Sequence, residues 1–316
     1  MTTDVYPELD VTSWEVVEIE QLGSKPYKRW LRKPGAAEGN LEEPAKWLFK
    51  PRTSQHLPSG DVPKGDDWAE KVASEIARKV EVPAARIELA KREAALGIIS
   101  GDVSVGRNLV LGNVVLFQHD PSYPMHQPRR VPGYTVEAIY RALRELAVEP
   151  PPGTPPDQDA CSVFASYLVL DALIGNTDRH HMNWGVLDDP GSPRVLAPTF
   201  DHASSLGFLL SDEQRNRRLD ATDPKQTVEA YASRGQSSSF EGSPGLVALA
   251  VEAARACPNP AAGDWLPRVA GYSLDSFDAI LDRMPEARMS RSSRMFARSL
   301  VAENRRRLLD ELTRAL

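Results

Sequence analysis

The chain has 316 residues, of which 41% are hydrophobic and 26% are charged, and its formal net charge is -6 at pH 7. This is the composition of a globular protein that is too long for one hydrophobic core, so two lobes are expected, and the acidic balance argues against a general nucleic-acid binder. No apolar run reaches the ~20 residues that span a bilayer, the N-terminus lacks the features of a secretory signal, and two cysteines are too few for a disulfide framework. We therefore expect a cytoplasmic enzyme that contacts neither membranes nor nucleic acids.

The N-terminal third of the chain has the alternating apolar and polar residues of β-strands. Strands are predicted at residues 16–21, 27–31, 47–49, 85–90 and 96–101. One helix, residues 68–80, is predicted from the helical spacing of Val72, Ile76 and Val80. Residues 1–101 are therefore expected to form a small β-rich lobe.

The segment between the first two predicted strands contains Gly23 and Ser24. With a single glycine it is neither a GxGxxG loop nor a Walker loop, so the P-loop ATPase class is excluded. Successive backbone N–H groups in a turn can still hold a phosphate oxygen. An ordinary hairpin turn and a phosphate-binding loop both stay open here.

Two further features of this lobe suit a phosphotransferase, which needs a lysine on the phosphates and an acid that holds the lysine. Lys50 ends the apolar strand 47–49, a context that favours it over Lys46 and Lys28. Strand 96–101 is apolar and ends at a glycine. In a kinase this position is the hinge, where backbone groups meet the adenine edge, and the candidates are Ile99, Ser100 and Gly101.

The rest of the chain, residues 102–316, is predicted to form a larger and mostly helical lobe. Helices are expected at residues 134–146, 161–174, 243–257 and 290–316, and a surface loop at the proline-rich residues 150–156. Residues 211–244 are polar and poor in apolar side chains, which predicts a mobile or lightly packed segment. That segment is either a plain surface excursion or a part that helps to receive substrate.

Residues 171–206 contain the most informative pattern of the chain. Asp178 is followed five positions later by Asn183, and Asp201 comes after two short apolar runs. The order D-x-x-x-x-N, strand-like segment, Asp is typical of kinase-type phosphotransferases. Asp178 would orient the attacking hydroxyl and accept its proton, while oxygen atoms of Asn183 and Asp201 would hold magnesium. Each residue alone is commonly a turn residue, so the prediction depends on the combination.

Histidines in the same segment allow a different reading. His180, His181 and His202 lie near two aspartates, but their spacing fits no zinc-ligand pattern. A pair of loop histidines that pack or hydrogen-bond is the preferred interpretation for His180 and His181. A metal-dependent hydrolase and a nucleotide-binding scaffold without turnover are the alternatives from other functional classes.

The runs IGNTDRHHMNWGV and APTFDHASSLG resemble the C-terminal domain of HipA-like serine/threonine kinases. DRHHMN is also similar to the catalytic loop of phosphatidylinositol 3- and 4-kinases. The resemblance is strong over residues 163–206 and weak elsewhere. It implies an α+β, two-lobed protein-kinase-like fold, ATP and Mg²⁺ as cofactors, and transfer of the γ-phosphoryl group to a Ser/Thr hydroxyl of a protein. The lipid-kinase alternative ranks second because no polybasic segment is present.

The resemblance also implies roles for individual residues. Asp178 matches the catalytic aspartate, Asn183 and Asp201 match the metal ligands, His180 matches the loop histidine, and Lys50 matches the phosphate-binding lysine. Glu70 aligns with the acid that holds this lysine, with Ala69 where the family has asparagine, and Glu75 is the runner-up. The family uses a glycine-poor phosphate loop, which implies nucleotide contacts by Gly23 and Ser24.

Partners follow from the same family. Some relatives are toxins that pair with an antitoxin or phosphorylate themselves in the phosphate loop, so Ser24 is the expected site of self-modification. Because the chain begins almost directly at the first kinase-like strand, we expect the extra N-terminal subdomain of the longer toxins to be missing. An antitoxin-type partner is the weaker expectation for that reason.

Overall fold

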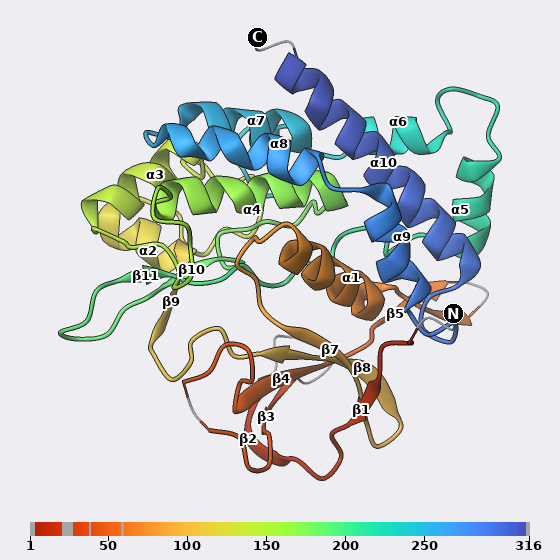
Figure 1. Cartoon of the computed structure of the whole chain (residues 1–316), viewed down its shortest axis with the longest axis horizontal. Helices are drawn as coiled ribbons and strands as arrows, with labels where there is room; N and C mark the ends of the chain where they lie inside the picture. Colours follow the sequence, from red (N-terminus) through yellow and green to blue (C-terminus); the bar gives the residue numbers. More distant parts are fainter. Residues whose placement is uncertain (1–3, 21–27, 38, 58–59, 314–316) are drawn as a thin grey trace.

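The structure is a computed structural model and describes residues 4–20, 28–37, 39–57 and 60–313 (Figure 1). The predicted phosphate-loop residues Gly23 and Ser24 lie outside these described residues. Figure 1 shows a β-sheet at one side of the molecule and helices at the other, with α1 between them. The predicted α+β class, with an N-terminal sheet and a helical C-terminal part, is confirmed.

The N-terminal sheet has six strands in the order β1-β7-β8-β4-β3-β2. The strands are β1 (Glu8–Asp10), β2 (Glu15–Glu20), β3 (Lys28–Arg32), β4 (Lys46–Pro51), β7 (Ile87–Arg92) and β8 (Ala95–Gly101). β1 pairs with β7 in parallel, and the other neighbours are antiparallel. A separate hairpin is formed by β5 (Ser54–Leu57) and β6 (Gly60–Pro63). The strands predicted from the alternating pattern are therefore all present, with ends shifted by one or two residues.

Helix α1 (Asp66–Lys79) covers one face of this sheet. Two aspartates in its first turn and two basic residues in its last turn complement the helix dipole. Its apolar face includes Trp68, Val72 and Ile76, which are buried in the main hydrophobic core. The opposite face of the sheet has a small core of its own, which consists of Val11, Leu31, Trp47, Phe49, Ala90 and Ile99.

The helical part is built around α4 (Ala160–Ile174), whose residues are all buried. A helix buried on every side is mostly apolar, and the charged residue within this one, Asp171, is paired with Arg179. It begins at a capping box of Asp159 and Ser162 and ends at Gly175, whose φ of 68° is left-handed. The surrounding helices are α2 (Gly112–His119), α3 (Val136–Glu145), α7 (Leu246–Ala256), α8 (Trp265–Ala270), α9 (Leu274–Asp282) and α10 (Arg291–Thr313), with a 3-10 turn at Pro260–Asp264. None of the helices in the described ranges has the length and apolar character needed to cross a membrane.

A three-stranded sheet lies beside α4 where the two parts of the chain meet. Its strand order is β11-β10-β9, with β9 (Leu109–Leu111), β10 (Gly185–Leu187) and β11 (Val195–Leu196). β10 and β11 lie within the predicted apolar runs that separate Asn183 from Asp201. The hairpin thus returns the chain from Asn183 towards the N-terminal sheet.

The prediction of a lightly packed segment at residues 211–244 is wrong. Two helices form there, α5 (Asp212–Leu219) and α6 (Val228–Ser233), and they begin at the side-chain caps Ser211 and Thr227. The few apolar residues of the segment are buried, since Val228 and Ala232 pack against Phe296 and Leu300 of α10. Composition averaged over the segment hid these contacts, which depend on a helix some 70 residues later.

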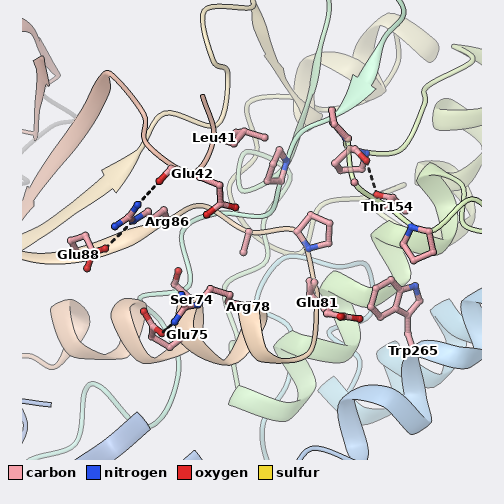
Figure 2. Close-up of a pocket in the computed structure, with 18 residues that line it drawn as sticks. Leu41, Glu42, Ser74, Glu75, Arg78, Glu81, Arg86, Glu88, Thr154 and Trp265 are labelled. Carbon is pink, nitrogen blue, oxygen red and sulfur yellow. Dashed lines mark hydrogen bonds and ion pairs between the residues drawn. The ribbon is translucent and has the colours of Figure 1, made fainter. Parts of the chain in front are cut away.

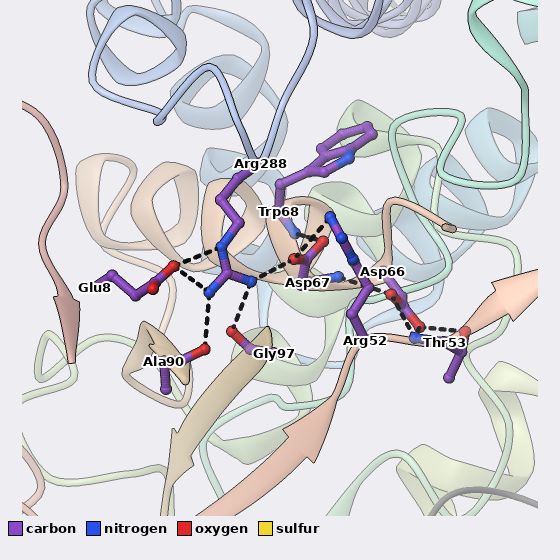
Figure 3. A network of polar contacts seen from close by, with 9 residues as sticks. All are labelled: Glu8, Arg52, Thr53, Asp66, Asp67, Trp68, Ala90, Gly97 and Arg288. Atoms are coloured by element: carbon purple, nitrogen blue, oxygen red, sulfur yellow. Dashed lines mark hydrogen bonds and ion pairs between the residues drawn. The ribbon is translucent and has the colours of Figure 1, made fainter. Parts of the chain in front are cut away.

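One buried arginine joins the C-terminal helices to the N-terminal sheet (Figure 3). Arg288, in the turn before α10, donates from Nη1 to Asp67 Oδ2 at 2.8 Å and from Nε to Glu8 Oε2 at 2.8 Å. It also donates to the carbonyl oxygens of Ala90 and Gly97 at 2.8 and 3.3 Å. A single guanidinium group therefore fixes β1, the first turn of α1 and the β7–β8 hairpin relative to the helices.

Candidate active site

The ammonium group of Lys50 is the centre of the candidate site. Lys50 Nζ donates to Glu70 Oε1 at 2.9 Å and to Asp201 Oδ1 at 3.0 Å. The lysine comes from β4, the glutamate from α1, and the aspartate from the segment after β11. The lysine side chain is 15% exposed and that of Asp201 is 32% exposed, so both can reach solvent or a ligand.

The structure distinguishes these residues from the alternatives that the sequence left open. Lys46 lies on the same face of β4, but its Nζ is 3.8 Å from Glu18 and above the ring of Trp30. Glu75 accepts hydrogen bonds from Lys71 and Arg78, each at 2.7 Å. Of the two candidate acids, Glu70 is thus the one that contacts Lys50.

Burial and charge act in opposite directions on these groups. Burial alone would raise the pKa of Asp201, but the Lys50 ammonium more than offsets this and holds that pKa well below its usual range. Burial alone would lower the pKa of Lys50, but Asp201 and Glu70 together raise it. Lys50 is therefore a cation and Asp201 an anion at neutral pH. Burial raises the pKa of Glu70, although Lys50 opposes the shift.

Asp201 also has an unusual backbone. Its φ is 62°, in the left-handed region that residues other than glycine seldom occupy. Aspartate tolerates this conformation better than most residues. Such backbone conformations cluster at functional sites, where the surrounding structure holds them.

The loop at residues 177–183 is attached to α4 by a buried ion pair. Arg179 donates from Nε to Asp171 Oδ2 at 2.7 Å and from Nη2 to Asp171 Oδ1 at 2.8 Å. Its Nη1 donates to the carbonyl oxygen of Asn183 at 2.6 Å. A bidentate pair of this kind fixes both distance and orientation. It therefore anchors the loop to the C-terminal half of α4.

Within this loop, Asp178 and Asn183 are directly connected. Asn183 Nδ2 donates to the carbonyl oxygen of Asp178 at 2.8 Å, and the Asp178 N–H donates to Asn176 Oδ1 at 3.2 Å. The amide nitrogen of Asn183 is thus engaged with the backbone. The atom that a hard cation prefers is its carbonyl oxygen.

A cavity of about 810 Å³ lies between the sheet and the helical part. Six predicted site residues line it: Lys50, Ser100, Gly101, His180, Asn183 and Asp201. Glu70 and Asp178 do not line the cavity, but each is bonded to a residue that does. Glu70 accepts a hydrogen bond from Lys50, and the carbonyl oxygen of Asp178 accepts one from Asn183. A volume of this size is within the range of small-molecule sites.

The predicted hinge needs one correction of register. Ile99 is fully buried in the small core of the sheet and does not line the cavity. The lining of the cavity begins at Ser100 and Gly101 and continues through Asp102, Val103 and Ser104. The error arose because an apolar strand gives no signal of where its free edge begins.

A second cavity, of about 550 Å³, lies beside the C-terminal half of α1 (Figure 2). Its lining includes Glu75, Arg78, Trp265 and the proline-rich loop 151–155. None of the predicted site residues lines it. Its acids Glu75 and Glu88 are paired with basic side chains. The chemistry is therefore concentrated in the first cavity.

The histidines near the site are held by hydrogen bonds. His181 Nδ1 lies 2.7 Å from the Tyr123 hydroxyl, and His202 Nε2 lies 3.1 Å from Thr199 Oγ1. Across the described ranges of the chain, no three His, Cys, Asp or Glu side chains converge on a common metal position. The geometry therefore does not favour the hydrolase reading over the phosphotransferase reading.

Acidification is expected to destabilise the fold through His181. Burial, with a contribution from His180, lowers the pKa of His181 from 6.5 to about 4. The unfolded chain accepts this proton near pH 6.5, so stability is complete above that pH and falls as pH drops towards 4, by about 3 kcal/mol in all. Burial of His202 lowers its pKa as well and acts in the same direction. Urea unfolding at pH 7 and pH 5 measures the difference.

His181→Gln should show a smaller loss between these two pH values than the wild type. The exposed His126→Gln variant is the matched control and should lose as much as the wild type. An unchanged pH difference in His181→Gln would show that this histidine does not cause the acid sensitivity.

Comparison with known proteins identifies the family of this chain. The family model for the HipA-like C-terminal domain matches residues 25–257, which is most of the chain. The chain belongs to this family. The match includes Lys50, Glu70, Asp201 and the loop at residues 177–183, called the catalytic-type loop below. It ends within the helical part.

Two solved structures show the fold that this HipA-like chain shares. The Helicobacter pylori proinflammatory kinase CtkA superposes with a TM-score of 0.70 at 18% identity, over 96% of each chain. HipA of Shewanella oneidensis MR-1, solved with HipB and operator DNA, superposes with a TM-score of 0.53 at 12% identity, over 94% of this chain and 66% of that chain. No curated protein sequence matches. The two-lobed kinase-like architecture predicted from the sequence is confirmed by these structures.

Sequence reasoning missed three residues near the candidate site. The ion pair of Arg179 with Asp171 was not expected, although Arg179 lies inside the D-x-x-x-x-N pattern and the charge of Asp171 inside an apolar helix was a usable signal. Ser238, whose hydroxyl donates to Asp178 Oδ1 at 3.1 Å, had no local signal at all.

Proposed function

We propose that this HipA-like protein transfers the γ-phosphoryl group of MgATP to a serine or threonine hydroxyl of a protein substrate. The observation that carries the proposal is the contact of Lys50 with both Glu70 and Asp201 at one cavity. A lysine held by a helix glutamate, beside an aspartate of the opposite lobe, is the arrangement that phosphoryl transfer requires.

The residues of the cavity suit a magnesium ion. Asp201 supplies an ionised and partly exposed carboxylate, and Asn183 supplies an amide oxygen from the neighbouring loop. Oxygen ligands in small number are what magnesium takes from a protein. When bound, the ion would neutralise charge on the phosphates. Asp201 and Asn183 would hold it.

The remaining roles fall to side chains of the chain itself. Lys50, fixed by Glu70, would bind phosphate oxygens. Asp178 would orient the acceptor hydroxyl and take its proton as the oxygen bonds to the γ-phosphorus, while the bond to the β-phosphate oxygen breaks and ADP leaves. Positioning and charge stabilisation provide most of the acceleration in such a reaction. Ser100, Gly101 and His180 would line the nucleotide.

Membership of the HipA-like family supports the proposal of a protein acceptor, and the solved complex of the Shewanella HipA with HipB supports that of an antitoxin-type partner. Self-phosphorylation at Ser24 is a separate proposal that concerns a residue outside the described ranges. Mass spectrometry of the ATP-treated protein tests it directly.

Incubation with radiolabelled ATP and a cell lysate tests the proposed function. Wild-type protein is expected to label a protein, and Asp178→Ala protein to label nothing while it keeps its thermal midpoint. Equal labelling by both would overturn the role of Asp178. Label on phosphoinositide vesicles in place of protein would favour the lipid-kinase alternative.

Thermal stabilisation separates the other two classes. A kinase should gain stability from ATP with magnesium, whereas a metal-dependent hydrolase should respond to zinc without nucleotide. Stabilisation by nucleotide without any transfer of label would identify a scaffold.

A further inference from the structure

A serine from a distant segment reaches the carboxylate of Asp178. Ser238 follows α6 in the chain, sixty residues after Asp178, and its Oγ donates to Asp178 Oδ1 at 3.1 Å. Both residues are half-buried. The proposed base of the reaction therefore has a fixed neutral donor on one of its two oxygens.

The backbone of Ser238 is held on both sides. Its N–H donates to the carbonyl oxygen of Thr177 at 2.9 Å, directly beside Asp178. Its carbonyl oxygen accepts from the N–H of Arg130 at 3.1 Å, and the next residue, Ser239, accepts from Val131 at 2.9 Å. The segment is thus attached both to the catalytic-type loop and to residues 130–131. A serine held in this way has little freedom to leave the carboxylate.

The neighbouring serines have different partners. Ser237 Oγ accepts from the N–H groups of Ser239 and Phe240, at 3.3 and 3.2 Å. Ser239 Oγ donates to the carbonyl oxygen of Pro128 at 3.4 Å and lies 3.2 Å from Ser238 Oγ, so it belongs to the same group of hydroxyls. Of these three serines, Ser238 is the one whose hydroxyl reaches Asp178. Ser233, at the end of α6, has an exposed hydroxyl that donates to the carbonyl oxygen of Ala230 at 3.1 Å and provides a matched control.

The main chain of Asp178 is already fixed without Ser238. Its N–H donates to Asn176, and its carbonyl oxygen accepts from the N–H of His180 and from Asn183 Nδ2, both at 2.8 Å. These bonds leave rotation of the carboxylate about its side-chain torsions undetermined. A donor on Oδ1 removes that freedom and leaves Oδ2 to receive the proton of an acceptor hydroxyl.

We propose that Ser238 is a positioning residue that orients the Asp178 carboxylate for phosphoryl transfer, an inference that rests on the proposed function. Ser238 acts through Asp178 and does not touch the phosphates. The segment at residues 235–241 is therefore part of the acceptor side of the site, and the side chain within it that matters is the hydroxyl of Ser238.

Ser238→Ala tests this role. A hydrogen bond to a charged group contributes about 1.5 kcal/mol or more, so kcat should fall by about 10-fold. KM for ATP should stay within about 2-fold, because Lys50, Asn183 and Asp201 are untouched. Ser238→Thr, which restores a hydroxyl, should recover most of the lost kcat. The thermal midpoints of all variants are measured alongside.

Ser233→Ala should keep kcat within about 2-fold of the wild type, since its hydroxyl bonds a carbonyl of its own helix, away from Asp178. A wild-type kcat in Ser238→Ala, or an equal loss in both alanine variants, would overturn the positioning role. Phosphate found on Ser238 after ATP treatment would also overturn it, because the serine would then be an acceptor. A wild-type protein that transfers no phosphate would instead overturn the proposed function, and this inference with it.

Discussion

Asp201→Asn protein is expected to lose about 1,000-fold in the rate of phosphoryl transfer, the size of effect that follows removal of a preorganised charge at a transition state. The substitution keeps the shape of the side chain but removes the negative charge that lies 3.0 Å from Lys50 Nζ. It also removes the proposed anionic magnesium ligand. Initial rates with labelled ATP at saturating magnesium measure the loss.

Asp188→Asn is the matched control for this experiment. Asp188 also pairs with a basic side chain, Arg194, at 3.1 Å and is 31% exposed, but it lies in the β10–β11 turn outside the cavity. The Asp188→Asn protein should transfer phosphate at the wild-type rate. Magnesium-dependent stabilisation by ATP should disappear in Asp201→Asn and persist in Asp188→Asn. Near wild-type turnover by Asp201→Asn would refute the assignment of this aspartate.

The second large effect is expected from Arg288→Met, which should lower the free energy of unfolding by about 3–5 kcal/mol. Arg288 and Asp67 are each only 1% exposed, and the substitution leaves the carboxylate buried with Arg52 at 3.9 Å as its nearest cation. Burial already raises the pKa of Asp67, although Arg52 and Arg288 oppose the shift. Urea denaturation of purified protein measures the change.

Two further variants determine whether the charge itself is responsible. Arg298→Met removes an exposed pair with Asp278 on the helical part and should change stability by less than about 1 kcal/mol. The double variant Arg288→Met/Asp67→Asn should be more stable than Arg288→Met alone, because no unpaired buried charge remains. Equal destabilisation by Arg288→Met and Arg298→Met would contradict the proposed importance of this network.

The Arg288 network also has a bearing on the site. Asp67 lies one helical turn before Glu70 on α1, and Arg288 fixes that first turn to the sheet that carries Lys50. The orientation of Glu70 towards Lys50 therefore depends on a residue from the C-terminal part of the chain.

Several features of the protein followed from the sequence alone. The catalytic-type loop was recognisable because Asp178 and Asn183 are five positions apart, so their proximity is a property of local chain geometry. The helix α4 and the strands of the sheet were predictable for the same reason, since their apolar periodicity is a local pattern. The strand before Lys50 and the apolar runs before Asp201 indicated these two residues, and the family resemblance added Glu70.

Other features were decided by packing between distant segments. Glu70 and Glu75 are both buried acids on α1, and the rotation of the helix on the sheet determines which of them meets Lys50. The inward position of Ile99 likewise depends on its neighbours in the sheet. Local patterns give the axis and length of an element but not its rotation against a partner.

The sequence by itself thus determined most strands of the sheet, helices α1, α3, α4, α7 and α10, and those site residues that lie in one loop, while the family resemblance implied the fold class. Only the tertiary structure decided which side chains of separate elements meet, as in Lys50 with Asp201, Arg288 with Asp67 and Ser238 with Asp178. The physical reason is that each of these contacts joins residues 60 or more positions apart. Hydrogen bonds and ion pairs are effective only within a few ångströms, a distance that the burial of apolar faces sets and that no local pattern records.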